Sequence, residues 1–347
     1  MIEKFTEGRD ETMNTFNRMR TTSNAVMSRG RPIAAALALT ACLVTPSLAD
    51  TFFFETGSPT GLPNNLGALS RRPSPGKAET ETADDFPLRE TTVITGAKIF
   101  GLIPLGTPLA NIRDVEVEVY QIFSDKNSDV SRTSGAPNFT TPNVPTRVNS
   151  PADVEIDTAT RARSEGTLAI SPTVLNESFT VGATVVNSLS VGAGSAGPFT
   201  GEEVQITITF TNPIVLPSGQ YFFRPEVLLS NGDDFFYLSG PRPIPGGSAL
   251  SPDRQAWIRN SNANLAPDWL RIGTDIIGVG AFNMAFSLNG ETVPDVGTPG
   301  RTNCHGRSLS ALAHQFGGIE QAASGLGFSN VQALQTAFAL FCEPTTE

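Results

Sequence analysis

Histidine and cysteine, two residue types that often carry out catalysis, are confined to the two ends of this chain. Its only histidines are His305 and His314, and its three cysteines are Cys42, Cys304 and Cys342. Residues 50–292 contain neither type, which excludes a Ser-His-Asp triad, a Cys-His dyad and a histidine-bound zinc ion from that segment. The two terminal cysteines and two histidines do not have zinc-finger spacing. A Cys304–Cys342 disulfide with surface or capping histidines is therefore the favoured interpretation.

One segment has oxygen ligands at the spacing of a calcium loop. Asp125, Asn127 and Asp129 stand at positions 1, 3 and 5 of such a loop. Position 6 is Val130 instead of glycine and position 12 is Ala136 instead of glutamate, so any calcium ion needs ligands from elsewhere. A solvated turn is the favoured interpretation, and calcium is the one cofactor that the sequence suggests.

Carboxylates and aromatic rings suggest two kinds of carbohydrate chemistry. Adjacent carboxylates occur at Asp84-Asp85, Glu202-Glu203 and Asp233-Asp234. Glycosidases use two carboxylates across a cleft, but neighbours on a strand point to opposite faces, so turns at strand ends explain these doublets better. Trp257, Trp269 and Tyr221 suggest a sugar-stacking platform, although packing in a core is the commoner use of such rings.

The element that must position these residues is a pair of strands. In residues 202–211 apolar side chains alternate with Gln and Thr, and residues 220–229 repeat the pattern after a Pro-Ser-Gly turn. The apolar side chains of the two arms are Val204, Ile206, Ile208 and Phe210, then Tyr221, Phe223, Val227 and Leu229. This pattern predicts a β-hairpin with one buried and one wet face, which must close a larger sandwich.

Other segments predict further strands and no helix of any length before residue 300. The expected strands are 51–54, 92–100, 115–120, 166–170, 173–189, 234–239, 268–272 and 281–288. In the third of these, Glu116 and Glu118 alternate with valines and are expected to face water. Residues 124–151 read as a long loop that is a candidate for carrying a site.

After a Pro- and Gly-rich stretch, the apolar residues recur at the spacing of a helix instead of that of a strand. Leu309, Leu312 and Phe316 predict a first helix, and residues 319–326 predict a second. Ser329 and Gln332 have the spacing of a capping box, with Ser329 as the N-cap of a third helix. The tail is expected to be a three-helix module closed by its two cysteines.

The first 49 residues resemble a secretory leader. Arg29 and Arg31 precede an uncharged apolar run at 33–44, which is too short to span a bilayer, and Ser47-Leu48-Ala49 follows as a cleavage site. We expect cleavage after Ala49, with Met27 as an alternative start. A lipobox-like Leu39-Thr40-Ala41-Cys42 keeps acylation of Cys42 open as the alternative.

Charge excludes a nucleic-acid partner. The leader holds six of the 24 Lys and Arg and four of the 34 Asp and Glu, which leaves 18 basic and 30 acidic residues and a net charge of −12. Phosphate binding requires a basic surface, and this balance is the reverse.

Several short motifs resemble those of exported bacterial proteins. Asn303-Cys304-His305-Gly306, Phe316-Gly317-Gly318, Leu326-Gly327-Phe328 and Phe341-Cys342 resemble a Cys-bracketed C-terminal segment of rhizobia-like bacteria. Glu81-Thr82-Ala83-Asp84-Asp85-Phe86, followed by Ile94-Thr95-Gly96-Ala97, is similar to uncharacterised exported β-sandwich proteins, some with a PEP-CTERM tail. Val293-Pro294-Asp295 stands where such a tail begins, but no membrane helix or basic end follows it. The resemblance implies an exported sandwich and transfers no catalytic residue.

Together these features predict a mainly β protein with a jelly-roll-like antiparallel sandwich. We expect a leader at 1–49, the sandwich at 50–292, a linker at 293–302 and a helical disulfide module at 303–347. The favoured role is a secreted or periplasmic binding or structural module without enzymatic activity, for which an extracellular glycan is the first ligand to consider. The alternatives are a carbohydrate-active hydrolase using paired carboxylates and a lipid-anchored envelope protein.

Overall fold

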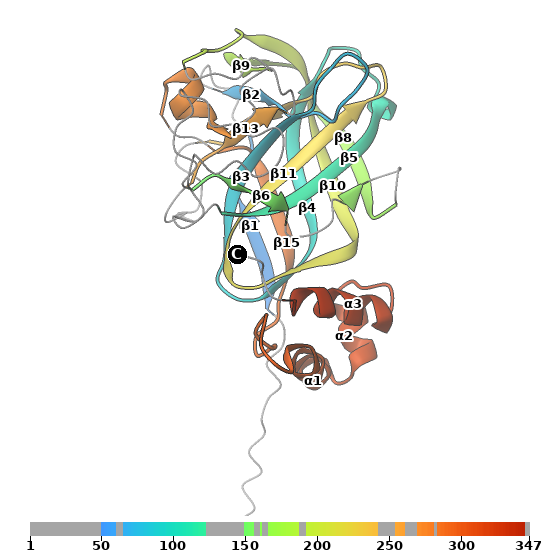
Figure 1. Ribbon diagram of the computed structural model, residues 1–347. Coiled ribbons are helices and arrows are strands. Elements are labelled where there is room, and N and C mark those ends of the chain that lie inside the picture. Colours follow the sequence, from blue (N-terminus) through green and yellow to red (C-terminus); the bar gives the residue numbers. More distant parts are fainter. Residues whose placement is uncertain are drawn as a thin grey trace, which may run out of the picture. The chain divides into compact units, whose positions relative to one another are not determined.

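The computed structural model describes residues 50–59, 65–122, 149–155, 160–161, 166–186, 192–241, 254–260, 269–280 and 283–343. All of these residues belong to one unit, Pro46–Glu347. Strands dominate them and form two sheets, and three helices follow near the C-terminal end (Figure 1). The expected mainly β class with a small helical tail is therefore confirmed. None of the helices in these ranges has both the length and the apolar character that crossing a membrane requires.

The first sheet is built around β4 (Thr92–Ile103). Strand β10 (Phe199–Leu216) pairs along one edge of β4, and β15 (Phe286–Thr292) and β12 (Phe236–Leu238) share its other edge. The remaining strands lie outside these: β8 (Leu168–Val181) beside β10, β1 (Thr51–Glu55) beside β15, β2 (Leu66–Leu69) beside β12, and β9 (Ala183–Val185) beside β2. Only the β2–β9 pairing is parallel among those described.

The second sheet has β11 (Gly219–Leu229) between β3 (Thr80–Leu88) and β5 (Ile112–Ile122). Beyond β3 lie β13 (Trp257–Asn260) and β14 (Leu270–Arg271), and β6 (Pro151–Glu155) and β7 (Thr160–Arg161) both pair with β5. All of these pairings are antiparallel. Glu116 and Glu118 of β5 and Arg224 and Glu226 of β11 belong to this sheet.

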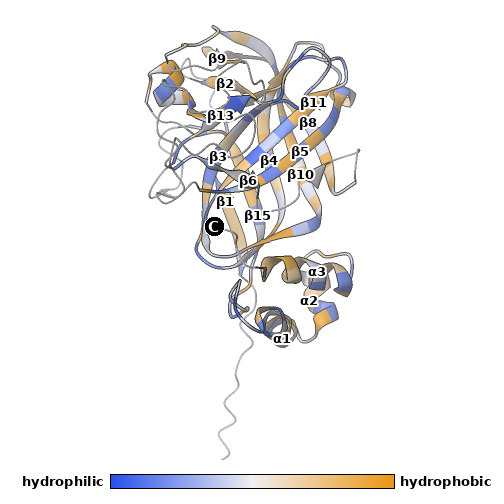
Figure 2. Ribbon diagram, in the orientation of Figure 1, coloured by the Kyte–Doolittle hydropathy of each residue, from blue (hydrophilic) through white to orange (hydrophobic). Residues whose placement is uncertain are grey.

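The two sheets face each other across one hydrophobic core. Ile99 and Ile206 of the first sheet are buried in the same cluster as Phe86 and Val117 of the second. Phe286 of β15 and Phe223 of β11 stack with ring centroids 5.2 Å apart, so the contact between sheets is direct. Both β5 and β11 carry hydrophobic and hydrophilic residues (Figure 2). The two kinds alternate from Val115 to Val119 of β5 and from Arg224 to Val227 of β11, as expected for strands with one face on this core.

The predicted pairing of residues 202–211 with residues 220–229 in a β-hairpin is wrong. Residues 202–211 and 220–229 both form strands, but β10 pairs with β4 and β8, whereas β11 pairs with β3 and β5. Pro217 and Ser218 carry the chain from one sheet to the other. Ile208 and Phe223 do share the core, so the apolar faces of the two arms meet through side chains instead of paired backbones. A period of two identifies the buried face of a strand and leaves its neighbour undefined.

Five strands in the described ranges were not predicted: β2, β3, β6, β7 and β13. Strand β3 contains two adjacent aspartates and Pro87, which are residue types depleted in strands, so the propensity signal was missing. Before residue 300 the described helical turns are η1 (Leu109–Asn111) and the π-helix η3 (Ile272–Ile277).

The tail forms the three predicted helices, α1 (Cys304–Phe316), α2 (Ile319–Gly325) and α3 (Val331–Phe341). The predicted cap of the third helix is wrong by one residue. Asn330 is the N-cap, and its Oδ1 accepts a hydrogen bond from the backbone N–H of Ala333 at 2.9 Å. Leu312, Leu334 and Phe338 form the helical core, which also includes Val93 of β4 and Val293 of the stretch after β15.

Candidate functional site

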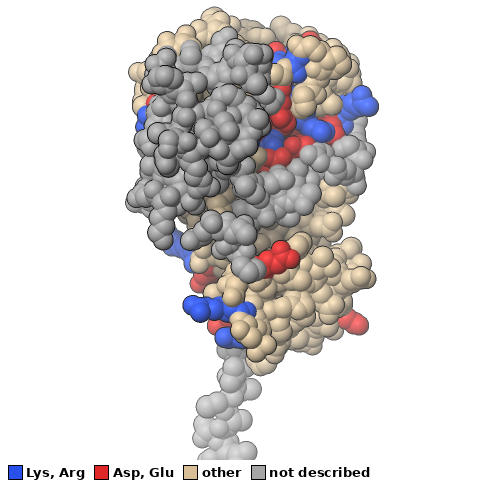
Figure 3. Space-filling view, in the orientation of Figure 1, with Lys and Arg blue, Asp and Glu red and all other residues tan. Residues whose placement is uncertain are grey.

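A cluster of charged residues covers the outer face of the second sheet. On β5 and β11 the residues that alternate with the core side chains are Asp114, Glu116, Glu118, Arg224 and Glu226. Arg224 stands directly opposite Glu118 across the two strands, and Glu226 stands opposite Glu116. Acidic and basic side chains gather over β5 and β11 in the space-filling view (Figure 3). Strand pairing therefore brings charges from different segments together on one face.

Arg224 lies at the centre of this cluster and is only 2% exposed. Its guanidinium pairs with Glu118 and lies 2.5 Å from Glu226 Oε2 and 3.4 Å from Glu116 Oε1. Glu81 Oε2 of β3 lies 3.7 Å from its Nε. Four carboxylates from three strands thus surround one buried cation.

Two further arginines extend the cluster toward solvent. Arg259 of β13 lies 2.9 Å from Glu81 Oε2 and 4.6 Å above the ring of Trp269. Arg72 pairs with Asp114 Oδ2 at 2.7 Å and with Glu116 Oε2 at 3.2 Å. With Glu79, the described cluster holds six carboxylates and three guanidiniums, so negative charge is in excess.

Burial and neighbouring charge shift the pKa values within the cluster in opposite directions. Burial, reinforced by the carboxylates of Glu79, Glu81 and Glu116, raises the pKa of Glu226 well above its usual value despite the nearby Arg224. Burial and the adjacent Glu81 also raise the pKa of Glu79. Glu118 behaves differently: although burial opposes its ionisation, the charge of Arg224 and the hydrogen bond donated by the Tyr120 hydroxyl hold its pKa below its usual value.

The expectation that Glu116 and Glu118 face water is wrong. Glu116 is 2% and Glu118 is 9% exposed, and both carboxylates form ion pairs with arginines. A polar residue opposite a core face is usually solvated, but here oppositely charged residues on neighbouring strands replace the water.

The three aromatic residues predicted as a sugar-stacking platform are all buried, and Tyr221 lies apart from the two tryptophans. Trp257 and Trp269 belong to one small cluster with Tyr120 and Phe222. Tyr221 lies in the main core, and its hydroxyl donates a hydrogen bond to the Pro217 carbonyl at 2.8 Å. The described structure therefore presents none of the three as an exposed ring, and packing is the role that it shows for them.

The three carboxylate doublets have separate partners. Asp84 Oδ2 accepts from the Met284 backbone N–H at 2.7 Å, and Asp85 Oδ1 accepts from that of Arg254 at 3.0 Å. Glu202 accepts from the backbone of Gly106 at 2.9 Å. Asp234 pairs with Arg71 and Lys77. These carboxylates therefore connect segments that are distant in sequence.

The proposed calcium ligands Asp125, Asn127 and Asp129 lie outside the described residues. Among the described residues, one group of carboxylates converges closely enough to hold a metal ion: Glu79, Glu116 and Glu226. Sequence reasoning missed this group because its members come from three separate segments. The available signal was the alternation of Arg224 and Glu226 in a strand otherwise rich in aromatic and aliphatic residues.

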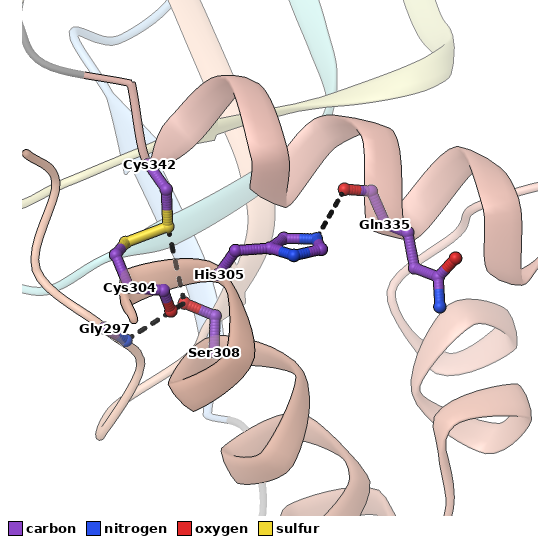
Figure 4. Close-up of a disulfide and its surroundings, with 6 residues drawn as sticks. All are labelled: Gly297, Cys304, His305, Ser308, Gln335 and Cys342. Carbon is purple, nitrogen blue, oxygen red and sulfur yellow. Dashed lines mark hydrogen bonds between the residues drawn. A yellow bond between two sulfur atoms is a disulfide. The ribbon is translucent and has the colours of Figure 1, made fainter. Parts of the chain in front are cut away.

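The predicted disulfide joins Cys304 and Cys342, whose Cα atoms lie 5.6 Å apart (Figure 4). Ser308 Oγ donates to the Cys304 carbonyl at 2.9 Å and accepts from the Gly297 backbone N–H at 3.0 Å. His305 Nε2 lies 3.1 Å from the Gln335 carbonyl oxygen, so this histidine connects α1 with α3. His314 is exposed, and no metal-ligand group among the described residues includes either histidine.

The geometry of the described face thus combines a buried ion-pair cluster with a half-buried charged margin. Its described residues include carboxylates, guanidiniums and an arginine that lies over an aromatic ring, and none of them is a histidine or a cysteine. Comparison of the chain with models of protein families, with curated proteins and with solved structures found no match.

Proposed function

We propose that the chain is an exported, non-enzymatic binding or structural module on a jelly-roll-like pair of sheets, with its ligand face on the outside of the second sheet. The observation that carries this proposal is the charged cluster around Arg224. Buried ion pairs rarely stabilise a protein more than apolar side chains of similar volume, so stability alone explains such a cluster poorly. Buried charged groups with shifted pKa values are typical of functional sites.

The margin of the cluster supplies the groups that a ligand would contact. The side chains of Arg72 and Arg259, at the edge of the cluster, are 22% and 23% exposed. Lys77, which is 35% exposed, precedes Glu79 of the cluster by two residues and pairs with Asp234, which is 30% exposed. These donors and acceptors are held in place by ion pairs and by the ring of Trp269. A polar, hydroxyl-rich ligand fits such a margin, and jelly-roll domains include lectins. An extracellular glycan is therefore the ligand that we propose.

Burial favours binding over hydrolysis at this face. Glu226 is 0% and Glu116 is 2% exposed, whereas a catalytic carboxylate must lie within hydrogen-bond reach of the bond that it cleaves. The hydrolase alternative predicts that any glycan bound by the protein is also shortened by it. Binding without release of reducing ends supports the proposed role.

A glycan array probed with the exported protein tests the proposal. We expect binding to a restricted set of glycans, and we expect Lys77→Ala to weaken it. Lys98→Ala is the matched control, because Lys98 is an exposed lysine on β4 of the other sheet. Absence of binding to any glycan would overturn the choice of ligand. Equal loss in both variants, or none in either, would show that this face does not bind it.

We propose export as the location of the mature protein, on the strength of the leader-like residues 1–49. Intact-mass measurement of the protein recovered outside the cytoplasm is expected to give Asp50 as the first residue. An acylated Cys42 at the N-terminus would instead support the lipid-anchored alternative.

A further inference from the structure

Three carboxylates of the charged cluster converge on one point. Glu79 precedes β3, Glu116 lies on β5 and Glu226 lies on β11. One oxygen from each of them lies within 4.8 Å of the oxygens of the other two. Three like charges at this separation repel one another, and burial strengthens the repulsion, so the group requires a cation or bound protons.

The arginines do not fully satisfy this group. Glu226 is 0% exposed and its Oε2 faces Arg224, but its Oε1 has no hydrogen-bond donor among the described residues. A buried carboxylate oxygen without a donor is costly, because it has lost its water and gained no partner. The cluster also contains three more carboxylates than guanidiniums. Both observations favour binding of a cation beside Glu226.

We propose that the carboxylates of Glu79, Glu116 and Glu226 together bind one calcium ion. Calcium takes oxygen ligands at about 2.3–2.6 Å, so two ligands on opposite sides of the ion lie about 4.8 Å apart. The three oxygens therefore fit within one coordination sphere. Zinc prefers nitrogen and sulfur ligands, which these residues do not provide, and magnesium requires a tighter octahedral arrangement.

The ion would act as a bridge between segments of the second sheet. It would link the residue that precedes β3 to the two neighbouring strands β5 and β11, and thereby fix the position of Lys77, which lies two residues before Glu79. This site does not depend on the glycan proposal, because the ion binds the protein alone. Failure of glycan binding and failure of metal binding are therefore separate results.

Thermal unfolding of the full-length exported protein tests the site. The protein is first treated with EDTA, and CaCl₂ or MgCl₂ is then added in increasing concentration. We expect calcium to raise the unfolding temperature saturably and at lower concentration than magnesium, and we expect isothermal titration to show calcium binding. A ligand that binds only the folded state stabilises it by mass action and so raises the unfolding temperature.

Matched variants decide which residues hold the ion. Glu79→Gln keeps the shape of a half-buried side chain and should abolish the calcium shift, whereas Glu203→Gln, a buried glutamate of the other sheet, should retain it. Asp125→Asn should also retain it. The proposal is overturned if calcium has no effect on the unmodified protein, if Glu79→Gln retains the full shift, or if Asp125→Asn alone abolishes it.

Discussion

The guanidinium of Arg224 and the carboxylate of Glu118 form an ion pair between directly opposite residues of β11 and β5. The Tyr120 hydroxyl donates a second hydrogen bond to the same carboxylate, and both charged side chains are buried. Glu81, Glu116 and Glu226 complete the surroundings of the arginine. The central cation thus offsets repulsion among carboxylates that would otherwise be buried together.

Arg224→Ala is expected to reduce the free energy of unfolding by about 3–5 kcal/mol, because it leaves buried carboxylates without their main cation. Arg224→Lys should recover part of this loss, since it restores the charge without the planar fork of donors. Arg113→Ala is the control, because Arg113 is exposed on β5. Urea unfolding measures all three. Similar stabilities for Arg224→Ala and Arg113→Ala would contradict the central role of Arg224.

Ile208→Ala tests the assignment of the core face of β10. Ile208 is 1% exposed in the core shared by both sheets, so truncation should cost about 2–5 kcal/mol by leaving a cavity. The neighbouring Thr207 is partly exposed on the other face, and Thr207→Val should change stability little. Denaturant melts of both variants check this, and equal effects would mean that the two faces have been exchanged.

Local pattern in the sequence was enough to predict the strands that alternate cleanly and the three helices. Val204, Ile206 and Ile208 identify a buried face because side chains on a strand point alternately to its two sides. The same pattern gave the wrong partner for β10. Which strands pair depends on contacts between distant segments, such as Ile208 with Ala97 of β4, and a short connection alone does not determine them.

The sequence shows which charged residues are available for the site, but not how they are arranged in space. Alternation of valine and glutamate in β5 shows that Glu116 and Glu118 share a face, but not that Arg224 stands opposite Glu118. Only the order of strands brings these charges together. Likewise, Trp257 and Trp269 are visible as large rings in the sequence. Their burial in one cluster, with Arg259 above the Trp269 ring and Tyr120 beside that ring, is a tertiary property.

The pH dependence of stability should include a contribution from Glu203. Burial on β10 raises the pKa of this carboxyl above its usual value, so the folded protein keeps the proton to higher pH than the unfolded chain does. The free energy of unfolding contributed by this group therefore falls as the pH rises from the usual carboxyl range through the raised pKa. Glu203→Gln cannot ionise and should lack this decline.

Urea unfolding between about pH 4 and pH 7 compares the unmodified protein with Glu203→Gln. The difference between their stabilities should shift in favour of the variant as the pH rises. Parallel curves across this range would show that burial does not disfavour ionisation of Glu203. The measurement is made in EDTA so that metal binding elsewhere does not contribute.

The last prediction concerns the disulfide and the helical tail. Cys304 and Cys342 are 38 residues apart in sequence, and they tie the start of α1 to the end of α3. Closing a loop of this length stabilises the folded tail by about 4 kcal/mol through the entropy of the unfolded chain. Three short helices have a small core, so this contribution is a large share of their stability.

Cys304→Ser is therefore expected to melt the tail helices while the two sheets, which have their own core, remain folded. Circular dichroism should show loss of helical signal with the strand signal retained, and thiol titration should find no free thiol at these positions before mutation. Ser310→Ala, at an exposed position of α1, is the control and should leave the helices intact. An unchanged helical signal in Cys304→Ser, or two titratable thiols in the native protein, would contradict this account, because the helices would then be stable without the covalent link between Cys304 and Cys342.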